Sequence, residues 1–330
     1  MRHITHIRDL GVDGVSRVLD RALGWKTTAP GAIFSGRILG MLFFNPSLRT
    51  RASFEAAMLR QGGHAIVIDV NSGSWKLETA DGAVMDGDRP EHIREAIPVL
   101  GGYVDALAVR CFADGNPAVD VQDQLMHSIR AHSLVPVVSM ESAREHPCQG
   151  LADMLTIREH CGELAGRKVT LSWAPHIKPL PQAVPNSFLL SAAAAGCEIT
   201  VAHPPGLELQ DEVLSEAQQL AQESGARISF RNDQQAACAD AEVLYAKSWG
   251  GATDLDFAEL ARQHSGWQVT RSLLEAGNVR SKLMHCLPVR RNVVLSDDAL
   301  DSELSLVAPQ AHNRLHVQRS LLHEVFNGGN

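Results

Sequence analysis

The chain has 330 residues, of which 45% are hydrophobic and 21% are charged. This length fits two domains of ordinary size, and the composition excludes a disordered or fibrous protein. A formal net charge of −8 argues against nucleic acid or an anionic membrane as the main partner. No secretory signal follows Met1, and the most apolar stretch is only about half as long as a membrane span. The 6 cysteines form no CxxC pair, so we expect reduced thiols in a soluble, cytoplasmic enzyme.

Short, nearly continuous apolar runs alternate with segments of helical period, which predicts strands and helices in alternation. In the first part of the chain, the predicted strands are Arg37–Phe44, His64–Asp69, Asp105–Arg110 and Val135–Met140, and the predicted helices are Arg51–Arg60, Glu91–Leu100 and Val119–His132. In the second part, the predicted strands are Lys168–Trp173, Glu198–Ala202, Arg227–Phe230, Val243–Ala246 and Leu283–Cys286, and helices are expected near residues 186–195, 210–224 and 254–263.

This alternation predicts an α/β fold with two doubly wound parallel sheets, each covered by helices on both faces. The natural boundary lies near residues 141–150, where a helix over Gly150–His160 would bridge the two halves. Many unrelated enzymes share this architecture, so the fold alone does not decide the chemistry. The sequence has no G-x-G-x-x-G after the first strand and no G-x-x-x-x-G-K-[ST], which disfavours a nicotinamide dehydrogenase or a P-loop NTPase.

A candidate anion site follows the first predicted strand. Ser47 is a good N-cap, so the next three residues would form the first turn of a helix, where backbone N–H groups lack partners. Those donors, the helix dipole and the guanidinium of Arg49 together suit a phosphate. A capped helix with two arginines is more often structural than functional. However, the string Ser-x-Arg-Thr-Arg at residues 47–51 resembles the carbamoyl-phosphate signature of the transcarbamylase family.

Three further segments resemble the same family, in the same order along the chain. His-Pro-x-Gln-x-Leu-x-Asp at residues 146–153 is similar to its second signature, and His-Cys-Leu-Pro-x-Arg at residues 285–290 is similar to its ornithine-type branch. Asn313-Arg314 falls where a returning C-terminal helix of the family contributes an arginine. Taken singly, these segments would be a capped helix start and a buried strand-end thiol. The resemblance implies a first domain over residues 1–140, completed by a helix near 311–330, and a second domain over residues 141–310.

The resemblance also implies roles for individual residues. The phosphate of carbamoyl phosphate would be held by Ser47, Leu48, Arg49 and Thr50, with Trp75 reaching in from a neighbouring subunit of a homotrimer. The carbonyl oxygen would be surrounded by Thr50, Arg110, His146 and Arg314. The carbamoyl NH2 would be held by Gln149 and the backbone carbonyls of Cys286 and Leu287. The expected catalytic residues are Arg110, His146, Cys286 and Arg314. No metal or organic cofactor is expected, because positioning and charge stabilisation suffice.

Several loops are similar to the branch of this family that acts on N-acylated ornithine. The Ser-Met-Gly loop with which ordinary ornithine enzymes read a free α-amine is absent, and a proline-rich segment at residues 178–187 resembles the loop of a trefoil-knotted backbone. Within this branch, enzymes of the acetyl type carry a glutamate where those of the succinyl type carry a proline, and this chain has Pro90. A glutamate there would repel a succinyl carboxylate. The plain structural alternative is that Pro90 is the first residue of a helix.

The resemblance therefore implies carbamoyl transfer from carbamoyl phosphate to the δ-amine of N-succinylornithine, in arginine biosynthesis. The second substrate would contact Pro90, Glu141, His176, Lys247 and Arg290, and how these residues divide the contacts is open. Either the departing phosphate or Cys286 would accept the proton of the amine. Two alternatives also stay open: the same reaction on N-acetylornithine, and a regulatory protein that binds phosphate without catalysis.

Overall fold

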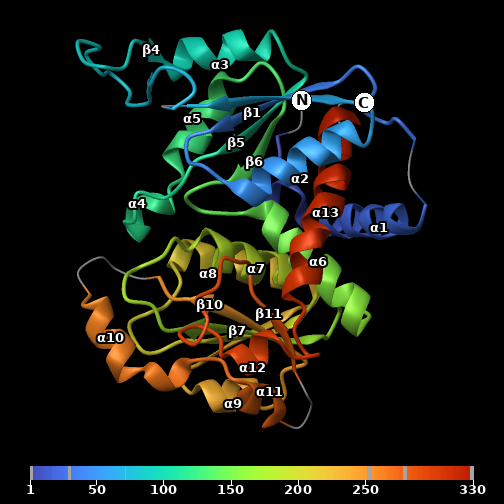
Figure 1. Ribbon diagram of the computed structural model, residues 1–330, viewed down its shortest axis with the longest axis vertical. Helices are drawn as coiled ribbons and strands as arrows, with labels where there is room; N and C mark the ends of the chain where they lie inside the picture. Colours follow the sequence, from blue (N-terminus) through green and yellow to red (C-terminus); the bar gives the residue numbers. More distant parts are fainter. Residues whose placement is uncertain (1–2, 29–30, 71, 251–254, 278–280, 328–330) are drawn as a thin grey trace.

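The computed structural model describes residues 3–28, 31–70, 72–250, 255–277 and 281–327. Within these residues, two larger parallel sheets form two lobes that helices join (Figure 1). The first sheet has the strand order β2-β1-β5-β6, and the second has the order β11-β10-β7-β8-β9. The predicted α/β fold with two parallel sheets is therefore confirmed.

Both faces of the first sheet are covered by helices, as buried parallel strands require. Leu107 of β5 belongs to one hydrophobic cluster with Ile97 of α3, whereas Met41 of β1 belongs to another cluster with Phe54 of α2. This alternation along the strands places α3 and α5 on one face and α1 and α2 on the other. The elements are α1 (Gly11–Thr27), β1 (Ile38–Phe43), α2 (Leu48–Leu59), β2 (His64–Asp69), α3 (Ile93–Gly101), β5 (Ala106–Arg110), α4 (Pro117–Asp120), α5 (Gln124–His132) and β6 (Val137–Glu141).

One predicted helix of this half is wrong. Residues Val119–His132 do not form a single helix, because they contain the end of α4 and all of α5 with a short turn between them. Asp123 lies in this turn with a φ of 48°, a left-handed conformation that a right-handed helix does not contain. The apolar spacing continues across the turn, so the periodicity of the sequence did not reveal the break.

An exposed arm, residues 72–92, leaves the first sheet between β2 and α3 (Figure 1). It contains β3 (Leu77–Glu78) and β4 (Glu91–His92), which pair in parallel with each other. The helix α3 begins only at Ile93, after the arm, and the side chain of His92 caps it. Pro90 is therefore not the first residue of a helix, and its place in the arm needs another explanation.

The second sheet is built in the same way. Every residue of α7 is buried beneath α6 and α8. A Cβ atom on Gly150 of α6 would lie 2.5 Å from the backbone oxygen of Ser187, so only glycine permits this close approach. The helix predicted near 254–263 begins at Phe257, and residue 254 lies outside the described residues. The elements are β7 (Lys168–Ala174), α7 (Ala183–Ala194), β8 (Glu198–Ala202), α8 (Asp211–Ser224), β9 (Arg227–Arg231), α9 (Gln234–Cys238), β10 (Val243–Ser248), α10 (Phe257–Gln263), α11 (Arg271–Glu275), β11 (Lys282–Met284) and α12 (Asp297–Leu300).

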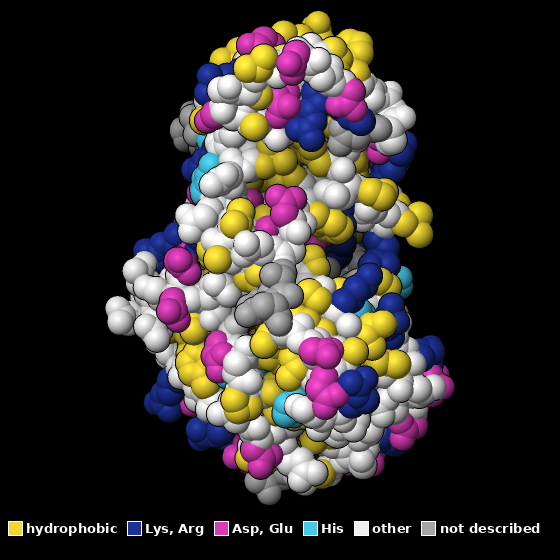
Figure 2. Space-filling model, turned by 90° about the vertical axis from the view of Figure 1, so that its left-hand side faces the viewer, with side chains coloured by type: hydrophobic (Ala, Val, Ile, Leu, Met, Phe, Trp, Pro, Cys, Tyr) yellow, Lys and Arg dark blue, Asp and Glu magenta, His cyan; other side chains and the backbone are white. Residues whose placement is uncertain are grey.

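Two long helices, α6 (Pro147–Cys161) and α13 (Val307–Asn327), connect the lobes. The helix α13 follows the second sheet in sequence, yet it packs against α6, α1 and α2 (Figure 1). Asn313 Nδ2 donates a hydrogen bond to Thr156 Oγ1 of α6 at 2.9 Å, deep in this contact. The expected returning helix near 311–330 is thus present and begins earlier, at Val307. In the space-filling view, the first lobe is the narrower of the two (Figure 2).

Two finer expectations of the fold stay predictions: the domain limits at residues 1–140 with 311–330 and 141–310, and the knotted backbone. In the part of the chain that the structure describes, no helix is both long and apolar enough to cross a membrane. The 6 cysteines are all free thiols.

A buried carboxylate in the loop after β6 forms a hydrogen bond with the N-terminal segment. Glu145 is fully buried, and its Oε2 accepts a hydrogen bond from the backbone N–H of Ile7 at 2.8 Å. Burial raises the pKa of Glu145 from its ordinary value of 4.5 to about 7, although the nearby His6 acts in the opposite direction. Between these two pH values, the folded protein holds a proton that the unfolded chain releases.

We predict that Glu145→Gln gains stability relative to the wild type as the pH rises. Because the folded-state pKa is raised, the stabilising contribution of the proton is complete below pH 4.5 and is lost as the pH rises through about 7. Glutamine is neutral throughout and keeps the acceptor for Ile7. The difference in unfolding free energy should therefore grow by up to about 3 kcal/mol over this range.

Urea unfolding at several pH values measures this difference. The control is Glu223→Gln, because Glu223 forms an exposed ion pair with Arg8 at 2.7 Å and should give no comparable trend. Parallel stability curves for Glu145→Gln and the wild type would contradict the prediction.

Candidate active site

A cavity of about 190 Å³ lies at the carboxyl ends of strands from both sheets. Strands β1, β5 and β6 of the first sheet and β10 and β11 of the second all end beside it. This edge is where parallel sheets bind their ligands. The cavity brings together most of the predicted site residues, namely Ser47, Arg49, Thr50, Arg110, Glu141, His146, Gln149, Lys247, Cys286, Leu287 and Arg314.

The first wall of the cavity is the phosphate turn, residues 47–50. Ser47 caps α2 as predicted, because its Oγ accepts a hydrogen bond from the backbone N–H of Thr50 at 3.3 Å. Arg49 lines the cavity, whereas Arg51 forms ion pairs of 3.3 Å with two carboxylates outside it. The helix N-terminus and the guanidinium of Arg49 thus form a site suited to a phosphate.

Donor groups converge beside the phosphate turn. Arg314 Nη2 donates to Thr50 Oγ1 at 2.9 Å, which leaves the hydroxyl hydrogen of Thr50 free to donate. Arg110 forms a buried ion pair with Glu141, and Nε2 of His146 lies 3.5 Å from Glu141 Oε2. Arg110 Nε, Arg314 Nε and His146 Nδ1 are buried without a hydrogen-bond partner among the described residues. Buried polar groups without a partner are rare in proteins, so their concentration beside the phosphate turn distinguishes this part of the molecule.

His146 is neutral at ordinary pH. Burial lowers its pKa far below the usual range, and the charges of Arg314, Arg110 and Arg49 lower it further. The backbone N–H of His146 donates to Ser187 Oγ at 2.7 Å, which fixes the residue at the start of α6. The imidazole therefore offers one N–H donor rather than a second positive charge next to the arginines.

The opposite wall is the thiol loop, residues 285–288, which follows β11. The backbone N–H of His285 donates to Gln310 Oε1 at 2.9 Å, and His285 Nδ1 accepts from the backbone N–H of Leu287 at 3.0 Å. Leu287 has a left-handed φ of 55°, so the backbone bends sharply at the cavity. Desolvation raises the pKa of Cys286, which is therefore a thiol at neutral pH. Lys247, at the end of β10, adds a cation to the same cavity.

Three predicted residues lie apart from the cavity wall. Leu48 belongs to the phosphate turn, but its side chain is 84% exposed. Trp75 and Pro90 both lie in the arm, and the indole of Trp75, which is 62% exposed, donates to Glu91 Oε2 at 2.7 Å. Neither arm residue lines the cavity of its own chain.

Two further predicted residues lie near the cavity without lining it. His176 is buried, and burial followed by the charges of Arg290 and Lys247 lowers its pKa. These three residues are therefore neighbours, although Arg290 is exposed and Lys247 alone reaches the cavity wall. Lys247 and Arg290 therefore supply positive charge beside the thiol loop, whereas His176, with its lowered pKa, is neutral at neutral pH.

Sequence reasoning missed several apolar residues of the cavity wall. The ring centroid of Phe112 lies 4.2 Å from the guanidinium carbon of Arg110 and so covers one face of that group. The sequence did contain a signal for Phe112, because this residue follows the end of a predicted parallel strand, where ligands bind. The other unpredicted lining residues are Leu180, Pro181, Val184 and Pro288.

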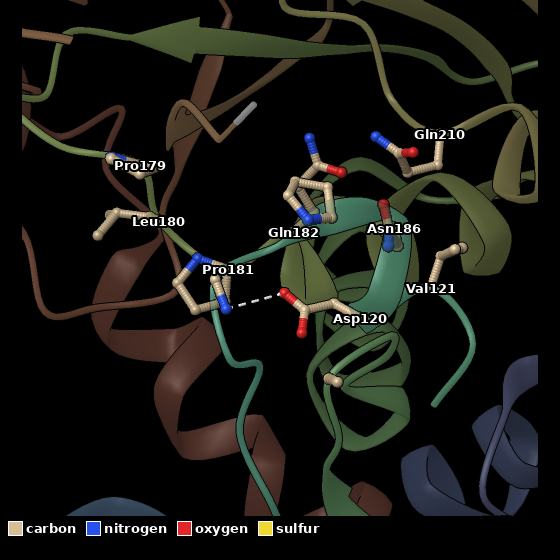
Figure 3. Close-up of a pocket in the computed structure, with 11 residues that line it drawn as sticks. Asp120, Val121, Pro179, Leu180, Pro181, Gln182, Asn186 and Gln210 are labelled. Atoms are coloured by element: carbon tan, nitrogen blue, oxygen red, sulfur yellow. Dashed lines mark hydrogen bonds between the residues drawn. The ribbon is translucent and has the colours of Figure 1, made fainter. Parts of the chain in front are cut away.

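The proline-rich segment forms a wall between two hollows. Leu180 and Pro181 line the cavity and also a smaller hollow of about 40 Å³ next to α4. Figure 3 shows this smaller hollow, which is also lined by the side chains of Gln182 and Asn186 from the same segment. Both amide atoms of Gln182 are buried without a partner among the described residues. The sequence had suggested only a connector or a knot for this segment.

The arrangement suits a small molecule that carries a phosphate and a carbonyl group. Two arginines and a neutral histidine converge where carbonyl oxygen charge could develop, next to a turn that suits phosphate. In the described ranges, no group of three or more His, Cys, Asp or Glu side chains could hold a metal ion.

Comparisons with known proteins give one consistent family. Residues 2–159 match the family model described as aspartate/ornithine carbamoyltransferase, carbamoyl-P binding domain, and residues 181–325 match the Asp/Orn binding domain of the same family. An N-succinylornithine carbamoyltransferase of Bacteroides fragilis (strain 638R) is 42% identical over 279 residues, which are 84% of each chain. An N-acetylornithine carbamoyltransferase of Xanthomonas campestris pv. campestris is 37% identical over 330 residues, with 98% of this chain and 97% of that one covered.

A solved structure has nearly the same fold. It is a variant of N-acetyl-L-ornithine transcarbamylase in which a glutamate is replaced by proline, complexed with carbamyl phosphate and N-succinyl-L-norvaline. Its TM-score with this chain is 0.94 at 36% sequence identity, and the match covers 98% of this chain and all of the other.

We predict that Arg49→Ala weakens the binding of inorganic phosphate, which isothermal titration calorimetry measures. Loss of a charged hydrogen bond of about 1.5–3 kcal/mol should raise Kd roughly 10- to 100-fold. The matched control is Arg51→Ala in the same helix, which should change Kd by less than about twofold because Arg51 does not line the cavity. Equal losses in the two variants would mean that overall positive charge, rather than the phosphate turn, attracts the anion.

Proposed function

This chain belongs to the aspartate/ornithine carbamoyltransferase family, and we propose that it transfers the carbamoyl group of carbamoyl phosphate to the δ-amine of N-succinyl-L-ornithine. The products are N-succinyl-L-citrulline and phosphate, and we place the step in the cytoplasm, in arginine biosynthesis. The observation that carries the proposal is the single cavity where the phosphate turn, the donor groups and the thiol loop meet.

Carbamoyl phosphate fits the half of the cavity that belongs to the first sheet. Its phosphate binds at the phosphate turn, where Arg49 and the N-terminus of α2 provide positive charge. Its carbonyl oxygen then faces the donors of Arg110, His146 and Arg314. Negative charge grows on that oxygen as the amine attacks. Each preorganised donor of this kind is typically worth about 3–4 kcal/mol in the transition state.

The carbamoyl NH2 faces Gln149 and the thiol loop. These groups offer acceptor oxygens, which orient the carbonyl carbon toward the incoming amine. The amine nitrogen forms a bond to this carbon, and the bond from the carbon to the phosphate oxygen breaks. The departing phosphate takes the proton that the amine loses, because Cys286 is already a protonated thiol and is a poor base.

The second substrate fits the half of the cavity that belongs to the second sheet. A carboxylate of N-succinylornithine suits the positive charges of Lys247 and Arg290, and the neighbouring His176 is a neutral polar group. The ion pair of Glu141 with Arg110 uses Oε2, so Oε1 can accept a hydrogen bond from the amine or from an amide N–H.

Pro90 supports the succinyl group over the acetyl group. The neighbouring structure with N-succinyl-L-norvaline carries proline in place of a glutamate, and the Bacteroides fragilis relative is named for N-succinylornithine. N-acetylornithine is the second candidate, because the Xanthomonas campestris relative is named for it. A regulatory protein that binds only phosphate would not need Gln149, the thiol loop or Lys247 in one cavity.

We infer that each site is shared between chains of a homotrimer. Trp75 and Pro90, the two predicted substrate contacts in the arm, do not line the cavity of their own chain. The large apolar surface of Trp75 is exposed, although aromatic side chains of this size are usually buried. Insertion of the arm into a neighbouring chain would bury Trp75 and bring Pro90 to the acyl group.

The proposed function predicts that N-succinylornithine gives the highest kcat/KM in a citrulline-type colour assay. Ornithine and N-acetylornithine are tested beside it with the same carbamoyl phosphate. Ornithine has no acyl group and cannot make the proposed acyl contacts, so its kcat/KM should be the lowest of the three. Higher kcat/KM with N-acetylornithine would move the assignment to the acetyl substrate, and no turnover with any amine would favour the regulatory alternative.

The same assay on Pro90→Glu tests the acyl contact. Two unit charges about 4 Å apart at an effective dielectric of about 20 repel by about 4 kcal/mol, and partial exposure reduces this. We therefore expect the kcat/KM for N-succinylornithine to fall by about one to two decades relative to that for N-acetylornithine. If both values stay unchanged in a folded protein, Pro90 does not face the acyl group.

The shared site predicts that two inactive variants complement each other. In a mixture of Trp75→Ala and Arg110→Ala, some cavities combine an intact Arg110 with an intact Trp75 from the neighbouring chain. Random exchange in a trimer should restore roughly a quarter of wild-type activity. Native mass spectrometry verifies the exchange. No recovery after verified exchange would mean that Trp75 acts within its own chain.

A further inference from the structure

Asp153 lies behind the cavity, one helical turn after Gln149 in α6. It is fully buried, and its Oδ1 accepts hydrogen bonds from Gln149 Nε2 at 2.8 Å and from Gln310 Nε2 of α13 at 2.7 Å. Two glutamine side chains thus end on one carboxylate oxygen. One of these glutamines lines the cavity, and the other receives the backbone N–H of His285 at the start of the thiol loop.

This arrangement determines which end of each amide points away from Asp153. A glutamine side chain can present either a donor NH2 or an acceptor oxygen, and a carboxylate oxygen only accepts. The NH2 group of Gln149 must therefore face Asp153, which leaves its oxygen for the cavity. In the same way, the NH2 group of Gln310 faces Asp153 and its oxygen accepts from His285.

The second oxygen of Asp153 connects to the thiol loop. Asp153 Oδ2 and the Tyr245 hydroxyl are both buried, and Tyr245 lies close enough to Asp153 to interact with it. Tyr245 interacts electrostatically with both Asp153 and Cys286, and burial followed by these neighbours raises the pKa of Tyr245. Burial also raises the pKa of Asp153 to about 7. A proton bound there would sit on Oδ2, since Oδ1 already accepts two hydrogen bonds, so the acceptor role of Oδ1 does not depend on it.

We propose that Asp153 is a positioning residue that makes the cavity selective for the carbamoyl group by holding the amide oxygen of Gln149 toward the carbamoyl NH2. This inference rests on the proposed function. Through Gln310, the same oxygen holds the backbone of the thiol loop, so both acceptors of the carbamoyl NH2 are aligned by one side chain. Both hydrogen bonds to Asp153 Oδ1 come from these glutamines rather than from the phosphate turn, and Arg314, which contacts Thr50, acts on Asp153 through its charge. We therefore expect phosphate binding to depend much less on Asp153 than carbamoyl phosphate binding does.

The simpler alternative is that Asp153 only joins α6 to α13. If Asp153 were purely structural, its loss would weaken the binding of every ligand of the cavity to a similar degree. The orientation of the Gln149 amide affects the binding of carbamoyl phosphate but not that of inorganic phosphate, because inorganic phosphate has no NH2 group. The change in kcat/KM for carbamoyl phosphate, compared with the change in the Ki for inorganic phosphate, therefore separates the two explanations.

The test uses Asp153→Leu and Asp153→Asn in the full-length protein. Leucine fills the volume without accepting a hydrogen bond, so kcat/KM for carbamoyl phosphate should fall roughly 10- to 100-fold while the Ki for phosphate changes by less than about threefold. Asparagine keeps an acceptor oxygen where Oδ1 lies and should restore most of this loss. If Asp153→Leu does not fold, Asp153→Ala replaces it with the same expected result.

Combination with Gln149→Ala shows whether Asp153 acts through Gln149. In the Gln149→Ala background, Asp153→Leu should lower kcat/KM for carbamoyl phosphate by less than a further threefold or so, because the amide that Asp153 orients is already absent. The matched control is Thr156→Val, which removes another buried contact between α6 and α13 and should leave KM and Ki within about twofold.

Three results would overturn the inference. Asp153→Leu could change kcat/KM for carbamoyl phosphate and the Ki for phosphate by the same factor, Asp153→Asn could be as impaired as Asp153→Leu, or Asp153→Leu could cause its full loss of kcat/KM in the Gln149→Ala background. Failure of the proposed function is distinguishable from these, because the wild type would then transfer no carbamoyl group to any ornithine.

Discussion

The geometry of this protein depends on two parallel sheets whose carboxyl ends meet at one cavity. Side chains and N–H groups at the ends of parallel strands converge on one edge, so each sheet alone provides half of a site. The helices α6 and α13 hold the two halves in place, and α13 does so by returning to the first lobe after the second is complete. Residues more than two hundred positions apart, such as Thr50 and Arg314, are therefore hydrogen-bonded at 2.9 Å.

Burial determines how the polar groups of the cavity behave. Two arginines lie next to His146, and a charged imidazole there would add a third positive charge without solvent. The protein avoids this by keeping His146 neutral, so the site gains a donor without further repulsion. The same low-polarity surroundings keep Cys286 protonated and raise the pKa of Asp153. Hydrogen bonds in such surroundings are stronger than in water, and a donor that lacks a partner destabilises the protein more than it would in water.

The arm has a different physical character from the cavity. Its one strand pairing and the ion pair between Arg89 and Glu78 lie within the arm itself, and the arm carries an exposed tryptophan. Surface ion pairs of this kind contribute little to stability. The proposed sharing of the site between chains would bury this tryptophan.

The sequence alone determined the strands, most helices, the cap at Ser47 and the motifs at residues 146–153 and 285–290, because local periodicity and short strings carry this information. It could not reveal the break at Asp123, where apolar spacing continues through a left-handed turn, or the role of Pro181 as a cavity wall. It also did not reveal that Asp153 aligns two glutamines, one of which is 157 positions away in the chain. Such contacts depend on how α13 packs against α6, and only the tertiary structure decides that, because no local pattern encodes which distant side chains share one buried oxygen.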